Sequence, residues 1–327
     1  MKKVFKIFVA LIFILLVTFI CYEAYVIFVQ DLEKQELEEQ AKIQEQENEQ
    51  EEIIADGPIF TLDNYPKVDA SLATQPLTDA FIEEFTGEEN ITEEYLDYTN
   101  THPAYLRLID KEVDLIVVTE PSEEELEYAK QNNIELEIVP VVREGFVFYV
   151  NAKNPVDNLS LEEIQKIYTG EITNWKEVGG NDEEIKAFQR PANSGSQTGM
   201  LSLVMKDKKI MKPIKENLVD TMFEIINLVS NYDNGQNSIG YSYYYYATTM
   251  FETIDKEISD RIKLLSINGI EPKNETIKSE EYPLGTAYYI VIRKDEPENS
   301  DTRKLMNAML SKRGQAVAEE VGYVGTK

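Results

Sequence analysis

The feature that most constrains this chain is the stretch from 185 to 200, which reads IKAFQRPANSGSQTGM. Its pattern predicts a short strand that ends at Arg190, followed by a loop in which Pro191 and Gly195 interrupt regular structure. A helix is expected to begin near Ser196, because apolar residues then recur at helical spacing. The expected apolar face of this helix consists of Met200, Leu201 and Val204.

The polar residues of this stretch predict a binding site for an anion. Backbone N–H groups in the first turn of a helix lack partners and carry partial positive charge, which stabilises a negative group placed there. Ser194, Ser196 and Thr198 add hydroxyl donors, and the guanidinium of Arg190 can donate to two oxygens at once. A small tetrahedral oxyanion matches these donors. The alternative from the local pattern is an ordinary capped helix beside a surface arginine.

Several motifs on either side of this stretch indicate a known family. They are LSLEEI at 159–164, IYTGEITNW at 167–175, VGG at 178–180, IGY at 239–241 and YPL at 282–284. Together with the 185–200 stretch, they resemble the phosphate-binding subunit of phosphate ABC transporters, a member of the periplasmic-binding-protein superfamily. The resemblance covers roughly residues 66 to 325.

The resemblance implies an α/β fold of type II with two lobes and a ligand cleft between them. Lobe I is expected to comprise residues 57–147 and 285–327, and lobe II residues 148–284. The segments 146–151 and 287–292 resemble the two crossings between the lobes, which would allow rigid-body closure on a ligand. The resemblance implies no cofactor.

The resemblance also implies ligand contacts from lobe I, although this sequence departs from the family pattern there. The family has a turn rich in hydroxyl groups where this chain has Ser71, Leu72 and Ala73, so only Ser71 keeps a hydroxyl and the other two residues can donate only through their backbone N–H groups. Thr101 is the nearest equivalent of a donor in a second turn, whose usual glycines are absent. From the residues alone, Ser71 could simply cap a helix.

A further departure lies at the end of the apolar run 113–118, which predicts a buried strand. The family usually has an aspartate after this strand that accepts the proton of hydrogen phosphate, whereas this chain has Thr119 followed by Glu120. Neighbouring residues of a strand point to opposite faces, so Glu120 reaches the cleft only if the strand ends at Thr119. Pro121 favours that hypothesis because it interrupts strand pairing. The alternative is that Thr119 alone faces the ligand.

The family resemblance assigns the remaining ligand contacts to the 185–200 stretch, in lobe II. These contacts are Arg190, Ser194, Gly195 and Ser196. The tyrosines at 241 and 243–246 could form an aromatic ligand site, but we expect their rings to pack into the core of the lobe.

Residues 1–29 predict a basic cytoplasmic stub and a membrane anchor. Lys2, Lys3 and Lys6 precede a long apolar stretch, which places the amino terminus inside the cell and the rest of the chain outside. Cleavage as a signal peptide would require small residues near the end of the stretch, and lipidation at Cys21 would require small residues before the cysteine. Bulky residues precede Cys21, and the segment Tyr22-Glu23-Ala24 supplies only one of the small residues that cleavage requires. We therefore expect retention of the segment as an anchor rather than either modification.

Residues 30–56 predict an acidic tether between the anchor and the lobes. Up to Glu52 this segment is nearly all Glu and Gln, with too few apolar residues for a regular packing stripe. A coiled-coil stalk that joins two copies is the alternative. We expect a solvated tether and a monomer.

The charge and the rarity of some residue types exclude several classes of function. A formal net charge of −28 opposes binding to nucleic acid. One cysteine cannot form an internal disulfide, and His102, the only histidine, has no cysteine nearby to complete a metal site. We expect His102 to be exposed or to cap a helix.

The sequence does not support an enzyme. No Gly-x-Ser-x-Gly motif surrounds Ser194 or Ser196, and a single histidine would have to perform all acid–base chemistry. The sequence instead predicts an extracellular, membrane-tethered protein that binds phosphate or a similar oxyanion and delivers it to the permease subunits of an ABC transporter. The alternative is a sensor or surface-assembly module that has the same fold but altered or lost ligand binding.

Overall fold

The computed structural model describes residues 57–89, 91, 97–231 and 235–326. The chain divides into an amino-terminal unit, Met1–Ala55, and a compact unit, Asp56–Lys327, and the fold below is that of the second unit. The predicted anchor and tether lie outside the described residues. Within the described residues, no helix is both long enough and apolar enough to cross a membrane.

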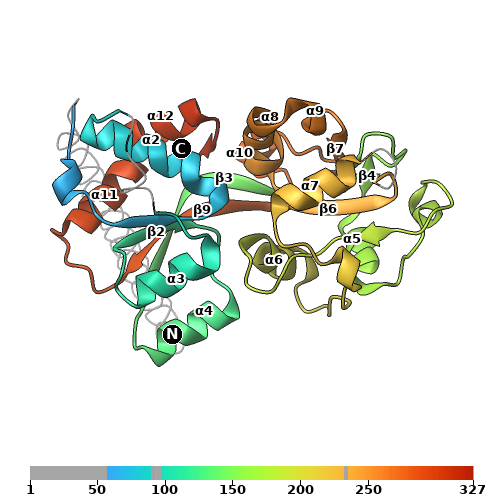
Figure 1. The fold of residues 1–327 in the computed structure, drawn as a ribbon, viewed down its shortest axis with the longest axis horizontal. Helices are drawn as coiled ribbons and strands as arrows, with labels where there is room; N and C mark the ends of the chain where they lie inside the picture. The colour runs from blue at the N-terminus through green and yellow to red at the C-terminus, as the bar shows by residue number, and fades with distance from the viewer. Residues whose placement is uncertain (1–56, 90, 92–96, 232–234, 327) are drawn as a thin grey trace, which may run out of the picture. The chain divides into compact units, whose positions relative to one another are not determined.

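Eight strands of the described residues form the main sheet, in the order β1-β2-β9-β3-β6-β5, with β10 and β7 also paired to β3 (Figure 1). Their bounds are β1 Val68–Ala70, β2 Leu115–Val118, β3 Leu136–Asn151, β5 Lys186–Ala187, β6 Ser238–Tyr243, β7 Ile262–Leu264, β9 Gly285–Arg293 and β10 Val324–Gly325. A second sheet consists of β4 (Asn158–Leu159) and β8 (Ser266–Ile267).

The strand β3 is shared by two parts of the main sheet. From Leu136 to Gly145 it pairs antiparallel with β9, and from Phe146 onward it pairs antiparallel with β6. The partner therefore changes between Gly145 and Phe146. The lobe boundaries expected from the sequence, 147/148 and 284/285, fall within β3 and at the start of β9.

The part of the sheet around β9, with its helices, is called here the β9 half. It contains β1, β2, β9, β10 and the first part of β3. Its helices are α2 Gln75–Thr86, α3 Thr101–Ile109, α4 Glu123–Gln131, α11 Asp301–Leu310 and α12 Lys312–Val321. Part of its core is a cluster of buried apolar side chains from α3, β2 and β9, including Tyr105, Ile116 and Val291. The buried strand expected at 113–118 is thus present as β2, and all four of its residues are buried.

The part around β6 is called here the β6 half, and it contains β5, β6, β7 and the second part of β3. Its helices are α5 Leu161–Thr169, α6 Gly195–Gly199, α7 Met222–Ser230, α8 Phe251–Ile254 and α9 Lys256–Ser259, and α10 Asn274–Lys278 contacts β3 and β10. Short 3₁₀ turns lie at Leu62–Asn64, Leu72–Thr74, Trp175–Val178 and Lys215–Asn217, and π-helical turns at Met200–Met205 and Tyr246–Met250. The rings of Tyr241, Tyr243 and Tyr246 are buried in the core, as expected.

The helix expected after Ser196 differs from an ordinary amphipathic helix. It begins at Gly195 and widens into a π-helical turn from Met200 to Met205. Met200 and Val204 are buried, but the side chain of Leu201 is exposed, so its predicted place on the apolar face is wrong. The wider turn changes the angle between successive residues and breaks the 3.6-residue spacing on which the prediction relied.

Candidate ligand-binding site

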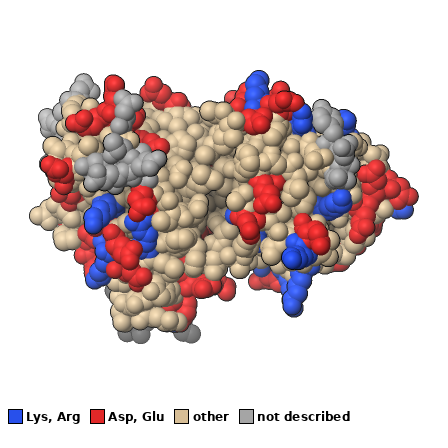
Figure 2. Space-filling view, viewed as in Figure 1, with Lys and Arg blue, Asp and Glu red and all other residues tan. Residues whose placement is uncertain are grey.

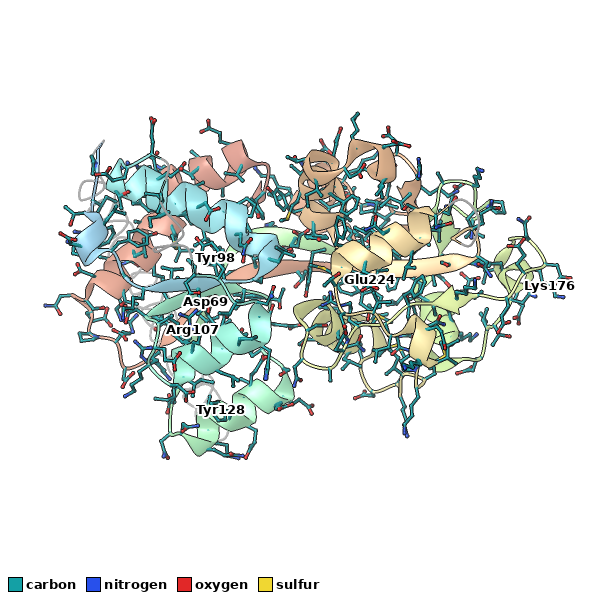
Figure 3. The ribbon with its side chains drawn as sticks, in the orientation of Figure 1. Asp69, Tyr98, Arg107, Tyr128, Lys176 and Glu224 are labelled. Carbon is teal, nitrogen blue, oxygen red and sulfur yellow. The ribbon has the colours of Figure 1, made fainter. Side chains whose placement is uncertain are left out.

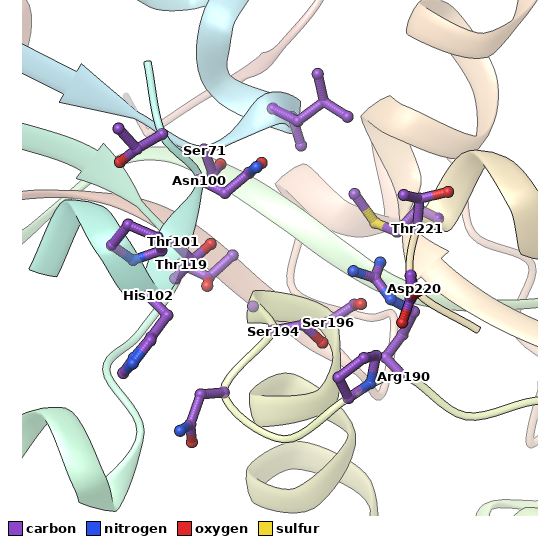
Figure 4. Close-up of a pocket in the computed structure, with 18 of the residues that line it drawn as sticks. Ser71, Asn100, Thr101, His102, Thr119, Arg190, Ser194, Ser196, Asp220 and Thr221 are labelled. Atoms are coloured by element: carbon purple, nitrogen blue, oxygen red, sulfur yellow. The ribbon is translucent and has the colours of Figure 1, made fainter. Parts of the chain in front are cut away.

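Residues from both halves line a cavity of about 330 Å³ (Figure 4). Every site residue predicted from the sequence lines it except Glu120 and Thr198. The predicted residues that line it are Ser71, Leu72, Ala73, Thr101 and Thr119 from the β9 half and Arg190, Ser194, Gly195 and Ser196 from the β6 half. The face of the protein shown in Figure 2 carries many acidic side chains, whereas its middle is largely uncharged.

The first wall of the cavity is the turn that follows β1. Ser71 is the N-cap of the 3₁₀ turn Leu72–Thr74, and its hydroxyl forms a hydrogen bond of 2.9 Å with the hydroxyl of Thr74. Its backbone N–H donates to the carbonyl of Val117 in β2. The turn is thus fixed to the end of β2, and the N–H groups of Leu72 and Ala73 lie in a first turn, where no preceding turn offers an acceptor.

The second wall is the start of α3, which a buried carboxylate holds in place. Asp69 is fully buried and accepts hydrogen bonds from the backbone N–H and the hydroxyl of Thr99, at 2.8 and 2.6 Å. Arg107 donates to the same carboxylate at 2.7 Å (Figure 3). Asn100 follows with a φ of 90°, and α3 then begins at Thr101. A network behind the cavity therefore fixes the turn that presents Thr101.

Thr119 and Glu120 lie in different environments. The hydroxyl of Thr119 is buried and lacks a hydrogen-bond partner, whereas its carbonyl accepts from the hydroxyl of Tyr105 at 2.8 Å. The carboxylate of Glu120 accepts a hydrogen bond from the hydroxyl of Ser202 and does not line the cavity. The hypothesis that Glu120 reaches the ligand is therefore not supported. The reason is the alternation of neighbouring residues in an extended chain, which Pro121 does not overcome.

The third wall comes from the 185–200 stretch. The backbone N–H of Arg190 donates to the side-chain oxygen of Gln197 at 3.1 Å and to the hydroxyl of Tyr241 at 2.9 Å, which fixes the backbone at Arg190. The guanidinium points into the cavity region (Figure 4), and its buried Nε has no partner. Burial lowers the pKa of Arg190, because removal from water disfavours the charged form, while the charge of Asp220 acts in the opposite direction.

Gly195 packs closely against two hydroxyl groups of the β9 half. A Cβ atom at this position would lie 2.6 Å from the hydroxyl oxygen of Thr119 and 2.7 Å from that of Thr101. These distances are shorter than any stable contact, so this packing requires glycine. The carbonyl of Gly195 accepts a hydrogen bond from the hydroxyl of Tyr243 at 2.9 Å.

Three buried polar atoms with no partner belong to residues that line this cavity. They are the hydroxyl oxygens of Thr119 and Ser196 and the Nε of Arg190, out of seven such side-chain atoms among the described residues. Leaving a buried polar group without a hydrogen bond costs about 1–3 kcal/mol. Buried polar groups in proteins nearly always have a hydrogen-bond partner, and a bound polar ligand would provide the missing partner here. Two hydroxyl donors and one guanidinium can bind a compact anion.

The cavity also includes residues that the sequence did not predict. Asp220 and Thr221 come from the loop before α7, and Asp220 is the only carboxylate among the described lining residues. Thr221 is the N-cap of α7, and its hydroxyl accepts from the backbone N–H of Glu224. A threonine before an apolar helix is a common N-cap, but no local pattern indicates that this loop returns to the cavity.

His102 also lines the cavity, at the start of α3. Its Nδ1 lies 2.8 Å from a carboxylate oxygen of Glu125, which is buried. Burial raises the pKa of Glu125, and the hydrogen bonds from the backbone of Ser122 and from His102 partly offset this effect. His102 is partly exposed, with 31% of its side chain accessible, and lies at the start of a helix. Within the described residues, no group of three or more His, Cys, Asp or Glu side chains is arranged to hold a metal ion.

Curated relatives of this chain are proteins named phosphate-binding protein PstS. The one from Borreliella burgdorferi is 29% identical over 191 residues, which cover 56% of this chain and 64% of that protein. The one from Bacillus subtilis is 30% identical over 140 residues, or 43% of this chain and 41% of the relative. The match with these two relatives thus spans less than two thirds of their length.

Solved structures show the same fold. A putative phosphate ABC transporter substrate-binding protein from Clostridium perfringens, solved with bound phosphate, has a TM-score of 0.62 at 23% identity and covers 80% of this chain and 98% of its own. An ABC-type phosphate transport receptor from Vibrio cholerae has a TM-score of 0.58 at 23% identity, with coverages of 79% and 98%. These likenesses confirm the α/β fold of the binding proteins expected from the motifs. The profile of the PBP superfamily domain matches residues 62–313, and the chain therefore belongs to the PBP superfamily.

Proposed function

We propose that this protein binds phosphate in the cavity between its β9 and β6 halves and delivers it to the permease subunits of an ABC transporter. The observation that carries this proposal is the presence of buried, unpartnered polar atoms at Thr119, Arg190 and Ser196. Phosphate offers four oxygens, enough to accept from all three residues and from the backbone N–H groups at Leu72 and Ala73. The names of the relatives support the same ligand.

We further propose that Asp220 distinguishes phosphate from sulfate. Near neutral pH phosphate still carries a proton that it can donate, whereas sulfate has none and would meet the carboxylate with two acceptors face to face. The position of Asp220 supports this role, because it is the one carboxylate among the described residues that line the cavity. The hydroxyl of Thr119 can donate or accept and would discriminate little.

Calorimetric titration of the full chain with phosphate and with sulfate tests the proposal. We expect wild type to bind phosphate and to prefer it clearly over sulfate. Asp220→Asn should weaken the binding of phosphate and strengthen the binding of sulfate, because the neutral amide no longer repels sulfate. The preference for phosphate over sulfate should therefore fall by about tenfold or more. Binding of neither anion by wild type would contradict the proposed ligand and favour a sensor or assembly module with lost ligand binding.

We also propose that the two halves act as the lobes predicted from the sequence, and that the amino-terminal segment tethers them outside the cell as a monomer. The apolar run before residue 30 and the basic residues at its start support the tether. Intact-mass measurement of protein extracted from membranes tests it. We expect the unprocessed chain, and a lipid on Cys21 or a mature start near residue 30 would contradict retention of the anchor.

A further inference from the structure

Two glutamates outside the cavity accept hydrogen bonds from residues of the other half. Glu120 follows β2, and its carboxylate accepts from the hydroxyl of Ser202. Glu124 lies in the first turn of α4, and its carboxylate accepts from the side-chain amide of Asn193. Both glutamates belong to the β9 half, and both donors belong to the β6 half. Glu120, Glu124 and Ser202 do not line the cavity.

The two donors lie at either end of the segment that carries the predicted anion contacts. Asn193 immediately precedes Ser194, Gly195 and Ser196, and Ser202 lies in the π-helical turn that follows α6. Between these two points, Gly195 packs against the hydroxyls of Thr101 and Thr119. The segment is therefore held at its start, at Gly195 and at its end.

The backbone conformation at both ends of the segment 193–202 is compatible with these hydrogen bonds. Asn193 has a φ of 64°, in the left-handed region that asparagine tolerates better than most residues. Ser202 lies where the helix widens, and π-helical turns often occur at functional sites. On the other side, Glu124 lies in the first helical turn of α4, where the helix dipole stabilises a carboxylate.

We infer that Glu120 and Glu124 act as positioning residues that clamp the segment 193–202 against the β9 half and thereby slow the release of the bound anion. This inference rests on the proposed function, because the anion is taken to be phosphate. Neither carboxylate lines the cavity, so the clamp acts on the contact between the two halves and not on the ligand itself. The donors are neutral, so the clamp adds no cation that would attract other anions to the rim.

The first test measures the release of radiolabelled phosphate from the full chain after a chase with unlabelled phosphate. Because both contacts are exposed, each is expected to contribute modestly, so Glu120→Ala and Glu124→Ala should each speed release about threefold and the double variant about tenfold. The rate at which phosphate associates with these variants should change little, since the residues that contact the ligand remain. Glu123→Ala is the matched control, because Glu123 is an exposed glutamate in the same turn of α4, and release should stay at the wild-type rate.

Double-mutant cycles show whether the effects come from these contacts. Once Ser202→Ala has been made, Glu120→Ala should cause almost no further acceleration. The second cycle uses Asn193→Gly with Glu124→Ala, since glycine removes the side-chain amide but adopts the same backbone conformation without strain. Additive effects in both cycles would overturn the inference.

Amide hydrogen exchange tests the clamp without reliance on phosphate. Backbone amides of 193–202 should exchange faster in the Glu120→Ala/Glu124→Ala variant than in Glu123→Ala, with or without phosphate. Unchanged exchange and unchanged release would overturn the inference. If wild type binds no phosphate, the proposed function fails, and the exchange comparison alone then decides whether the clamp exists.

Discussion

The two sides of the cavity differ in how their polar groups are satisfied. In the β9 half, the hydroxyl of Ser71 already bonds to Thr74, and Asp69 holds the turn before Thr101 through Thr99. In the β6 half, the Nε of Arg190 and the hydroxyl of Ser196 are buried without partners. The polar groups of the β9 half therefore mainly stabilise the cavity wall, whereas those of the β6 half remain available to form hydrogen bonds with a ligand. Thr119 is the exception in the β9 half, since its hydroxyl is also unpartnered.

The largest expected effect is on the stability of the β9 half. Asp69→Ala leaves Arg107 without its buried carboxylate and Thr99 without its acceptor. The loss of a fully buried carboxylate that accepts several hydrogen bonds should lower the free energy of unfolding by about 3–5 kcal/mol, because each hydrogen bond to a charged group contributes about 1.5–3 kcal/mol. Denaturant unfolding measures this loss.

Asp97→Ala is the matched control for Asp69→Ala, because Asp97 also pairs with Arg107. The side chain of Asp97 is 75% exposed, so its removal should cost less than about 1 kcal/mol. Equal losses in the two variants would contradict the idea that the buried network stabilises this wall.

A buried carboxylate between the two halves gives the second effect. Glu144 lies at the change of partner in β3 and accepts from the backbone N–H groups of Gly145 and Tyr245, yet burial raises its pKa to about 8. The folded protein then keeps a proton that the unfolded chain releases above the ordinary pKa of glutamate, so stability falls as pH rises between about 4.5 and 8. Within this range the free energy of unfolding should decrease by up to about 1.4 kcal/mol per pH unit. Glu144→Gln should remove it, because glutamine does not titrate.

Unfolding free energies of wild type and Glu144→Gln at several pH values between 5 and 9 check this prediction. The free energy of unfolding of Glu144→Gln, relative to that of wild type, should rise with pH up to about 8 and then remain constant. A constant difference across the whole range would show that the glutamate does not titrate there. Tyr288 and Tyr323 also lie near this carboxylate, and burial keeps the pKa of each well above its usual value, so neither titrates in this range.

The third effect is on binding by the β6 half. Arg190→Ala removes the buried guanidinium and should cost about 1.5–3 kcal/mol in phosphate binding, or about 10- to 100-fold in Kd. The fold should remain, because Arg190 lies in a cavity wall and not in an apolar core. Calorimetry compares it with Lys212→Ala, an exposed lysine whose loss should change Kd little. An unchanged Kd for Arg190→Ala would place the site elsewhere.

The smallest effect concerns the contact between the two sides. Gly195→Ala forces the segment away from Thr101 and Thr119, because its Cβ would lie within 2.7 Å of both hydroxyl oxygens. We expect phosphate binding to weaken about tenfold, since a shift of a few tenths of an ångström already disturbs donor geometry. Thermal unfolding should change little. Unchanged binding would mean that the two sides approach less closely in solution.

The sequence was most informative where local chemistry determines the structure. Ser122 with Glu125 and Ser160 with Glu163 match the sequence pattern of a capping box, and the structure contains both boxes. Gly170 ends its helix in the left-handed conformation, as a glycine at that position indicates. The order of strand, loop and helix in the 185–200 stretch is also as predicted, although the strand β5 ends at Ala187 and not at Arg190.

The sequence was least informative where position depends on the fold as a whole. Glu120 and Thr119 are adjacent, and only the path of the chain after β2 decides which of them faces the cavity. Asp220 comes from a loop thirty residues after Arg190, and its return to the cavity depends on the packing of α7 against β6 and β3. Local propensity carries no information on such distant contacts.

The position of β9 in the sheet has a consequence for how the protein folds. The strand lies between β2 and β3, and it pairs with both, although it is formed by residues 285–293 near the carboxyl end. Until those residues leave the ribosome and pair, β2 and β3 each keep an open edge that another chain could bind. Pairings over such long sequence separations form slowly. A chain interrupted before Gly285 would therefore be expected to aggregate rather than to fold as a smaller protein.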